Sequence, residues 1–348
     1  MTEKSSKKKS IIKIVAICLT SIMILTGGIL AYVYAKVDDT LNQITVPTKE
    51  AEKTDIETGE PIIQQVVDKQ KPFTVLLAGL DNRVESGSIN TDVLMFASYD
   101  PESKRATILS LPRDLKINSE EIGTHKVNYF FPYFYSRDKT TALAETKQFF
   151  NELVGLPIDY MITINFTGLK EIVDSLGGLD INVDMDMRYV DNFDGTNINL
   201  KAGQQLLDGK EVLDFVRYRK SNRGTEESSD FARNERQQQV VNQLLNKLGT
   251  LNGISQWDSI LEIIGNNIKT DIEKQTLRDW IINFNDVKPA STDLIKIEST
   301  WKSPYVYAKR DSLVAAVSQI REQIGMEQLI SDELLLEHFG TVDIPTTE

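Results

Sequence analysis

The sequence predicts an α/β fold, in which a mixed sheet is flanked by helices, in a single extracellular domain after one N-terminal membrane helix. Short apolar runs typical of strands alternate with longer segments of helical periodicity beyond residue 70. No internal repeat and no clear linker divides this region. A charge-free run of 22 residues near the N-terminus is long enough to cross a bilayer.

The N-terminus has the pattern of a membrane anchor. Five lysines within residues 1–13 precede the apolar run Ile14 to Ala35. A helix of that length spans about 33 Å, and the lysines favour a cytoplasmic N-terminus with everything after Lys36 outside. A cleaved signal peptide is the alternative, with Val33 to Ala35 as processing site, but its apolar core is normally shorter. We therefore expect a single-pass protein of the cell membrane, and both interpretations export the rest.

Cysteine usage and net charge exclude several classes of function. Cys18 is the only cysteine and lies within the apolar run, so the exported part has no disulfide, thiol nucleophile or cysteine zinc site. The net charge of −12 argues against nucleic acid as a partner, because a binder of phosphate backbones carries a basic face.

The first half of the chain contains a polar segment followed by strands and helices. Residues 36–70 are polar with mixed charges, which predicts a stalk with a short helix around Ile62 to Val67. The expected strands are Phe73–Leu80, Val93–Tyr99, Ala106–Leu111, Tyr160–Phe166 and Leu179–Val183. The expected helices are Thr141–Val154 and Thr167–Leu176, each ending at glycine.

The second half is mainly helical. Gly203–Asp208 and Gly209–Phe215 are expected to form two short helical turns. Longer helices are expected at Phe231–Leu248, Ile254–Ile268, Glu273–Phe284 and Asp311–Ile324, with one strand at Leu294–Ile297. The folded domain is therefore expected to span residues 71–325, followed by an acidic, frayed tail at residues 326–348.

Two aspartates flank one loop at the edges of two expected strands. Asp81 follows the first strand and Asp92 precedes the second, so both carboxylates can converge on one point. Two hard oxygen donors suit a magnesium ion that completes its shell with substrate phosphates. The alternative is a pair of aspartates that cap turns, and spacing alone does not separate these interpretations.

Arginines supply the second kind of candidate residue. Arg113 follows Pro112 at the end of an apolar strand, where a plain surface charge is the alternative. Arg217 and Arg219 alternate as on a strand, and Arg233 and Gln237 lie four apart on one helix face. Guanidinium groups bind phosphate oxygens in two-pronged fashion, although a surface ion-pair network also fits this charge run.

Carboxylates for a metal, arginines for phosphates and no covalent nucleophile together indicate electrostatic phosphoryl transfer. His125 has no partner in a Ser-His-Asp pattern, and no nucleotide-binding glycine motif is present. The metal and the arginines would stabilise charge on the leaving phosphate, while an aspartate takes the proton of an attacking hydroxyl.

Seven ordered motifs give this chain a family resemblance. They are LLAGLDNR, NTDVLMFASYDP, ILSLPRDLKI, HKVNYFF, LPIDYMITINFTGLKEIVDSLGGLDINV, LKAGQQLLDGKEVLDFVRYRKS and DFARNERQQQVV. Over residues 72–325, with the tail and anchor, the chain resembles the LytR–CpsA–Psr family of bacterial cell-wall ligases. The resemblance implies transfer of a glycopolymer, such as a teichoic acid or a capsular or rhamnose polysaccharide, from undecaprenyl-pyrophosphate to peptidoglycan. It also implies dependence on magnesium (or manganese) and an apolar slot for the polyprenyl tail.

The resemblance assigns roles to individual residues. Asp81 and Asp92 correspond to the metal- and pyrophosphate-side carboxylates, and together with Arg113 they form the expected catalytic set. The expected pyrophosphate-binding residues are Arg83, Arg113, Lys126, Arg217, Arg219, Arg233 and Gln237.

Two positions depart from the family pattern. Asn90 stands where an arginine is frequent, and Phe130–Tyr135 replaces a glycine-rich stretch. This aromatic stretch is expected to pack in the core, with a wall of the lipid or sugar channel as the alternative. A polyprenyl-pyrophosphate hydrolase and a non-enzymatic scaffold that binds the lipid carrier are the competing functions.

Overall fold

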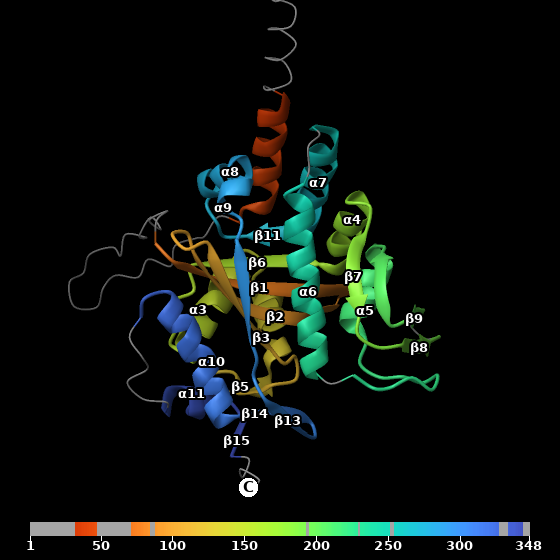
Figure 1. The fold of residues 1–348 in the computed structure, drawn as a ribbon. Coiled ribbons are helices and arrows are strands. Elements are labelled where there is room, and N and C mark those ends of the chain that lie inside the picture. The colour runs from red at the N-terminus through yellow and green to blue at the C-terminus, as the bar shows by residue number, and fades with distance from the viewer. Residues whose placement is uncertain are drawn as a thin grey trace, which may run out of the picture.

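The fold is mixed α/β, as predicted, and is built on a central six-stranded sheet (Figure 1). The computed structural model describes residues 32–46, 71–83, 88–192, 195–228, 230–250, 254–326 and 333–343. In spatial order the strands are β11 (Ile268–Thr270), β6 (Tyr160–Asn165), β1 (Phe73–Arg83), β2 (Ser88–Asp100), β3 (Arg105–Leu111) and β12 (Ser291–Ile295). β1 pairs with β6, and β3 with β12, in parallel, whereas the other neighbours are antiparallel.

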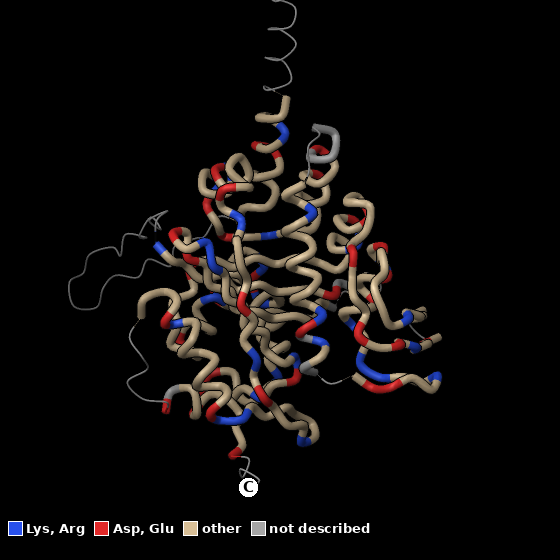
Figure 2. Tube along the Cα trace, in the orientation of Figure 1, with Lys and Arg blue, Asp and Glu red and all other residues tan. Residues whose placement is uncertain are grey.

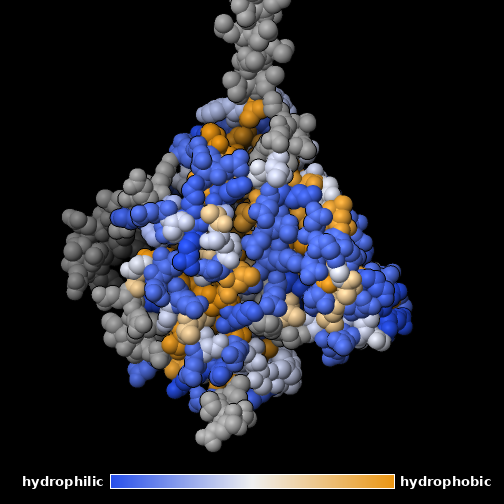
Figure 3. Space-filling model, viewed as in Figure 1, coloured by the Kyte–Doolittle hydropathy of each residue, from blue (hydrophilic) through white to orange (hydrophobic). Residues whose placement is uncertain are grey.

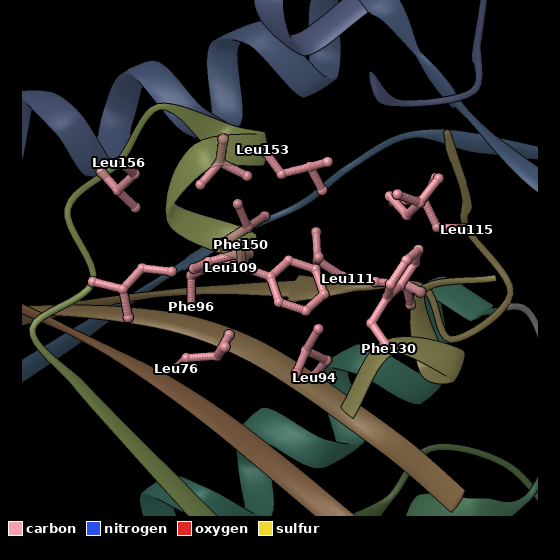
Figure 4. Close-up of a cluster of buried hydrophobic side chains, with 14 of the residues drawn as sticks. Leu76, Leu94, Phe96, Leu109, Leu111, Leu115, Phe130, Phe150, Leu153 and Leu156 are labelled. Carbon is pink, nitrogen blue, oxygen red and sulfur yellow. The ribbon is translucent and has the colours of Figure 1, made fainter. Parts of the chain in front are cut away.

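One face of the central sheet is fully covered. Alternate residues of β1, including Leu76 and Ala78, point to this face and are buried. They pack with Phe96 of β2 and Phe150 of helix α3 (Ala142–Val154), as Figure 4 shows. Helices α2 (Phe130–Arg137) and α10 (Arg310–Gln323) complete the layer. Burial of each large side chain stabilises the fold by about 1.5–3 kcal/mol, so this layer holds the sheet rigid.

A second group of elements has a hydrophobic core of its own. It contains α4 (Phe166–Ser175), α5 (Gly209–Arg217), α6 (Asp230–Leu248), the sheet of β7 (Leu179–Val183) with β10 (Gly203–Leu207), and the hairpin of β8 (Met187–Asp191) with β9 (Thr196–Leu200). Val173, Phe215 and Tyr218 lie at the centre of this core. Helix α7 (Ile254–Asn267) packs against α4.

Smaller elements surround these layers. They are β4 (Lys116–Ser119), β5 (Gly123–Lys126), the 3-10 helix η1 (Val127–Tyr129), α8 (Lys274–Ile282), α9 (Phe284–Val287), β13 (Ser299–Lys302), β14 (Tyr305–Lys309), α11 (Glu333–His338) and β15 (Thr341–Val342).

The N-terminal boundary of the domain differs from the expected one. Residues 32–44 form a helix rather than part of an unpacked stalk. Its Leu41 is 0% exposed and packs with Leu261 of α7, because apolar residues three and four apart form one stripe. The helix expected around residues 62–67 lies outside the described residues.

The C-terminal tail is packed rather than frayed where the structure describes it. Leu335 of α11 and Phe339 just after it are buried in the main core, and β15 pairs in parallel with β14. Burial of Leu335 and Phe339 outweighs the acidic composition of the tail.

The segment Gly203–Asp208 is also corrected. It forms strand β10 and not a helical turn, because Leu207 pairs with Leu179 of β7 while its neighbours alternate in exposure.

No helix among the described residues has the length and apolarity needed to cross a bilayer. The predicted span, residues 14–35, lies outside the described residues except for 32–35.

Candidate functional site

A β-bulge at the end of β1 and β2 positions the two predicted carboxylates. Gly79 pairs with Val93 but Leu80 pairs with Thr91, so Asp92 is the extra residue of β2. Such a bulge re-aims a side chain at the edge of a sheet. Gly79 allows close packing beside it, because an added Cβ would lie 3.0 Å from the Cβ of Val93. Asp81 lies two residues beyond Gly79 and therefore points to the same face.

Arg113 holds Asp92 in place. Its Nη1 donates to Asp92 Oδ1 at 2.6 Å from the loop that follows β3. The Nε of Arg113 is buried and has no hydrogen-bond partner among the described residues. A buried donor without a partner costs about 1–3 kcal/mol, so an anionic ligand that accepts this hydrogen bond would be stabilised.

The end of α5 supplies the next two cations, but not from a strand as expected. Helix α5 begins at a capping box formed by Asp208 and Glu211 and ends at Arg217. Arg217 Nη2 lies 3.6 Å from Asp81 Oδ2, and its guanidinium lies 5.5 Å from the ring centre of Phe166. Arg219 follows in the loop.

Asp114 is a site residue that the sequence analysis missed. It is only 4% exposed, and its carboxylate lies 3.0 Å from Lys126 Nζ and 3.5 Å from Arg219 Nη2. It therefore links two of the predicted phosphate-binding cations. Its position directly after Arg113 was the available signal, but a buried aspartate has the same appearance in sequence as an exposed one.

Helix α6 contributes from the other side. Arg233 and Gln237 lie one turn apart, as predicted, and both are buried. Arg236 does not join them, because its guanidinium pairs with Asp184 at 2.6 Å and donates to Ser228. Arg236 therefore has a structural role.

Six of the predicted residues line one cavity of about 150 Å³. It is lined by Asp92, Val93, Arg113, Phe166, Val216, Arg217, Arg219, Arg233 and Gln237. Four of these side chains are guanidinium groups and one is a carboxylate, so the cavity favours an anion of high charge density. This concentration is local, because acidic and basic residues are interspersed along the rest of the chain (Figure 2).

The remaining predicted residues lie beside this cavity. Asp81 forms an ion pair with Arg217, which lines the cavity. Lys126 pairs with Asp114, which in turn pairs with the cavity residue Arg219. Arg83 ends β1, and its side chain lies outside the described residues. Among the described residues, no point is surrounded by three or more His, Cys, Asp or Glu side chains.

Comparison with known proteins identifies the family. The model of the LytR_cpsA_psr family matches residues 31–323. This chain belongs to the LytR–CpsA–Psr family.

Named relatives of this LytR–CpsA–Psr protein are teichoic acid transferases. It is 28% identical to the polyisoprenyl-teichoic acid–peptidoglycan teichoic acid transferase TagU of Bacillus licheniformis, over 93% of this chain and 99% of the relative. It is 27% identical to the corresponding TagT of Bacillus subtilis, over 95% and 97% of the two chains. The crystal structure of B. subtilis TagV is similar with a TM-score of 0.58 at 25% identity, covering 75% of this chain and 100% of that one.

The aromatic stretch in this LytR–CpsA–Psr chain mainly serves the core. Phe130, Phe131 and Phe134 of α2 are buried, which confirms the packing interpretation. Pro132 and Tyr135 instead line a wide cavity of about 740 Å³ beside the start of β2.

Proposed function

We propose that this chain transfers a glycopolymer, such as a teichoic acid, from a polyprenyl-pyrophosphate carrier to peptidoglycan at the outer face of the cell membrane. The arginine-lined cavity carries this proposal. It presents four guanidinium groups and the unpartnered buried Nε of Arg113, all suited to a pyrophosphate. The names of the relatives support transfer of teichoic acid rather than of another phosphate ester.

The proposed reaction is a displacement at phosphorus. The oxygen of an acceptor hydroxyl forms a bond to the phosphorus that carries the glycopolymer. The bond from that phosphorus to the bridging oxygen breaks, and the polyprenyl phosphate leaves with the bonding electron pair. The hydroxyl proton passes to a carboxylate of the site, for which Asp81 and Asp92 are the candidates. Arg113, Arg217 and Arg219 stabilise the charge that moves onto the leaving phosphate.

Asp81 and Asp92 have the chemistry to hold a magnesium or manganese ion. Their side chains are 14% and 13% exposed and come from neighbouring strands. Carboxylate oxygens suit such an ion, which keeps its remaining positions for water and substrate phosphates. When bound, the ion would neutralise charge on the phosphate oxygens. Arg217 and Arg113 form ion pairs with Asp81 and Asp92, respectively.

An apolar row on the central sheet supports a lipid-linked substrate. Val93 lines the cavity and shares its face of the sheet with Leu77 and Met95, since residues two apart point the same way. Leu77 and Ile162, which are paired across β1 and β6, are only half-buried. Figure 3 shows apolar surface in the middle of this face of the molecule, beside α6. A polyprenyl chain along this row would place its pyrophosphate at the arginines.

The decisive experiment measures transfer by the full chain in lipid nanodiscs. The donor is a radiolabelled polyprenyl-pyrophosphate glycan and the acceptor is peptidoglycan, with magnesium or with EDTA. We expect label on the acceptor only with magnesium, and loss of it in Asp92→Ala. Asp293→Ala, which removes a surface carboxylate paired with Arg105, is the matched control and should transfer normally.

Two other outcomes would replace the proposal. Release of labelled glycan into water without acceptor labelling would indicate a hydrolase. Tight donor binding without transfer or hydrolysis would indicate a lipid-carrier scaffold.

A further inference from the structure

A second cavity adjoins the arginine-lined one. It has a volume of about 190 Å³ and shares Arg217 and Arg219 with the first cavity. It is also lined by Tyr189 of β8, Thr196 and Ile198 of β9, Asp214 of α5, and Lys220. The first cavity is closed instead by the central sheet, α4 and α6. The two cavities therefore share Arg217 and Arg219 but are otherwise lined by different elements.

The lining of the second cavity suits a sugar. An aromatic ring packs against the apolar face of a pyranose, while hydroxyl and carboxylate oxygens take its hydroxyl groups. Tyr189 supplies the ring, and its hydroxyl donates to Asp191 Oδ2 at 3.2 Å, which fixes the ring on the hairpin. Thr196 and Asp214 supply the oxygens.

Asp214 is held ready for such a role. Its side chain is 13% exposed, and Lys210 Nζ donates to its Oδ2 at 2.6 Å. Burial raises the pKa of the Asp214 carboxyl above its ordinary value, although Lys210 and Arg217 act in the opposite direction. A buried carboxylate that is paired on one oxygen gains from a hydroxyl donor on the other.

We propose that this second cavity binds the acceptor sugar of peptidoglycan, with Tyr189 stacking on the ring and Asp214 accepting a hydrogen bond from a hydroxyl. The proposal rests on the proposed transferase function. In a displacement at phosphorus, the attacking and leaving oxygens lie on opposite sides of the phosphorus. Val93 of the lipid row lines the first cavity, whereas Arg217 and Arg219 line both cavities. A phosphate held by these two arginines would therefore adjoin the second cavity, from which the acceptor would attack.

The test measures acceptor binding and donor binding separately, with the full chain in nanodiscs. The acceptor probe is a soluble peptidoglycan tetrasaccharide, whose binding is followed by saturation-transfer NMR and whose KM is measured in the transfer assay. The donor Kd is measured with the polyprenyl-pyrophosphate glycan alone. The variants are Tyr189→Ala, Tyr189→Phe and Asp214→Asn. Asp186→Asn is the matched control, since it removes an aspartate–lysine pair outside the cavity.

We expect Tyr189→Ala and Asp214→Asn to raise the acceptor KM by ~10-fold or more, with the donor Kd unchanged. Tyr189→Phe keeps the ring and should retain tetrasaccharide binding, and Asp186→Asn should behave as the wild type. A weakened donor Kd with an unchanged acceptor KM would overturn the inference and assign the cavity to the donor glycan.

Failure of the proposed function has a different signature. In one case the wild type binds the tetrasaccharide, Tyr189→Ala does not bind it, and no label is transferred. The sugar site then stands and the transferase proposal falls. If the wild type transfers label but the tetrasaccharide gives no NMR signal and the variants are unchanged, the sugar site falls and the transferase proposal stands.

Discussion

Arg217 and Arg219 are two residues apart, yet they occupy different environments because a helix ends between them. Arg217 is the last residue of α5 and is held between Asp81 and the ring of Phe166. Arg219 lies in the loop, where Asp114 anchors it. The intervening Tyr218 is fully buried, so its packing in the core fixes the backbone of both arginines.

Replacing either arginine should therefore cost far more activity than replacing a nearby exposed arginine. We expect Arg217→Ala or Arg219→Ala to lower kcat/KM for transfer by about 100-fold, as for the loss of one charge-stabilising donor. Arg223→Ala is the control, since Arg223 is exposed and lines neither cavity. Equal losses in all three variants would show that a diffuse surface charge, and not a built cavity, binds the substrate.

Asp114 should stabilise the free protein more than the ligand-bound one. Asp114→Asn leaves Lys126 and Arg219 facing each other without their shared anion. We expect urea unfolding to show a loss of about 1–2 kcal/mol, because both cations are partly exposed. Inorganic pyrophosphate should restore part of this loss, since it replaces the missing anion.

The comparison variant for Asp114 is Asp293→Asn, whose pair with Arg105 is largely exposed. It should change the unfolding free energy by less than about 0.5 kcal/mol and respond to pyrophosphate like the wild type. An Asp114→Asn variant as stable as the wild type would contradict an anchoring role.

Residue types predicted much of the site, but burial did not follow from them. Asp92, Arg113, Arg217, Arg219, Arg233 and Gln237 line one cavity, as their chemistry suggested. Asp114 was passed over, and the neighbouring Arg236 of α6 pairs with Asp184 rather than joining the site. These charge pairs join residues 52 and 105 positions apart in the sequence, and periodicity does not reveal such contacts.

Elements with strong internal periodicity were predicted well, and elements defined by a partner were not. Helices α3, α4, α6 and α10 each carry an apolar stripe, and all were expected within a few residues of their bounds. Among the described strands, β10 pairs with β7 alone, so its conformation depends on that partner. The start of α5 has a local sequence signal, because Asp208 and Glu211 have the spacing of a capping box.

The helix of residues 32–44 should contribute to the stability of the domain. Leu41→Ala removes a side chain that is packed against α7, and we expect a loss of about 2–4 kcal/mol in urea unfolding. Asp39→Ala on the exposed side of the same helix should change stability by less than about 0.5 kcal/mol. If both variants unfold like the wild type, this helix is a detached stalk after all.

At the scale of the whole molecule, the site lies where the two packed layers meet. The central sheet brings Asp81, Asp92 and Arg113, and the second layer brings Arg217 and Arg233. Each layer has its own core, so Arg217 and Arg233 are positioned by one layer, whereas the two carboxylates and Arg113 are positioned by the other. The sequence motifs predicted most of the residues of the site, but packing of the whole domain brings these residues together.

The C-terminal segment closes the main core, so truncation at the expected domain end should be severe. A chain that stops at residue 325 loses Leu335 and Phe339, which are 0% and 1% exposed, and the backbone bonds of Gly340 to Lys116 and Ala308. Loss of two such side chains costs about 3–6 kcal/mol, which is a large part of the ~5–15 kcal/mol that stabilises a typical domain. We expect that truncation to lower the urea midpoint strongly, whereas a chain that stops at residue 343 keeps all of these contacts and should unfold like the full chain. Removal of a docked segment with two fully buried side chains exposes the core beneath it and lowers stability. Equal midpoints for the two truncations would therefore mean that residues 326–343 bind the core only weakly.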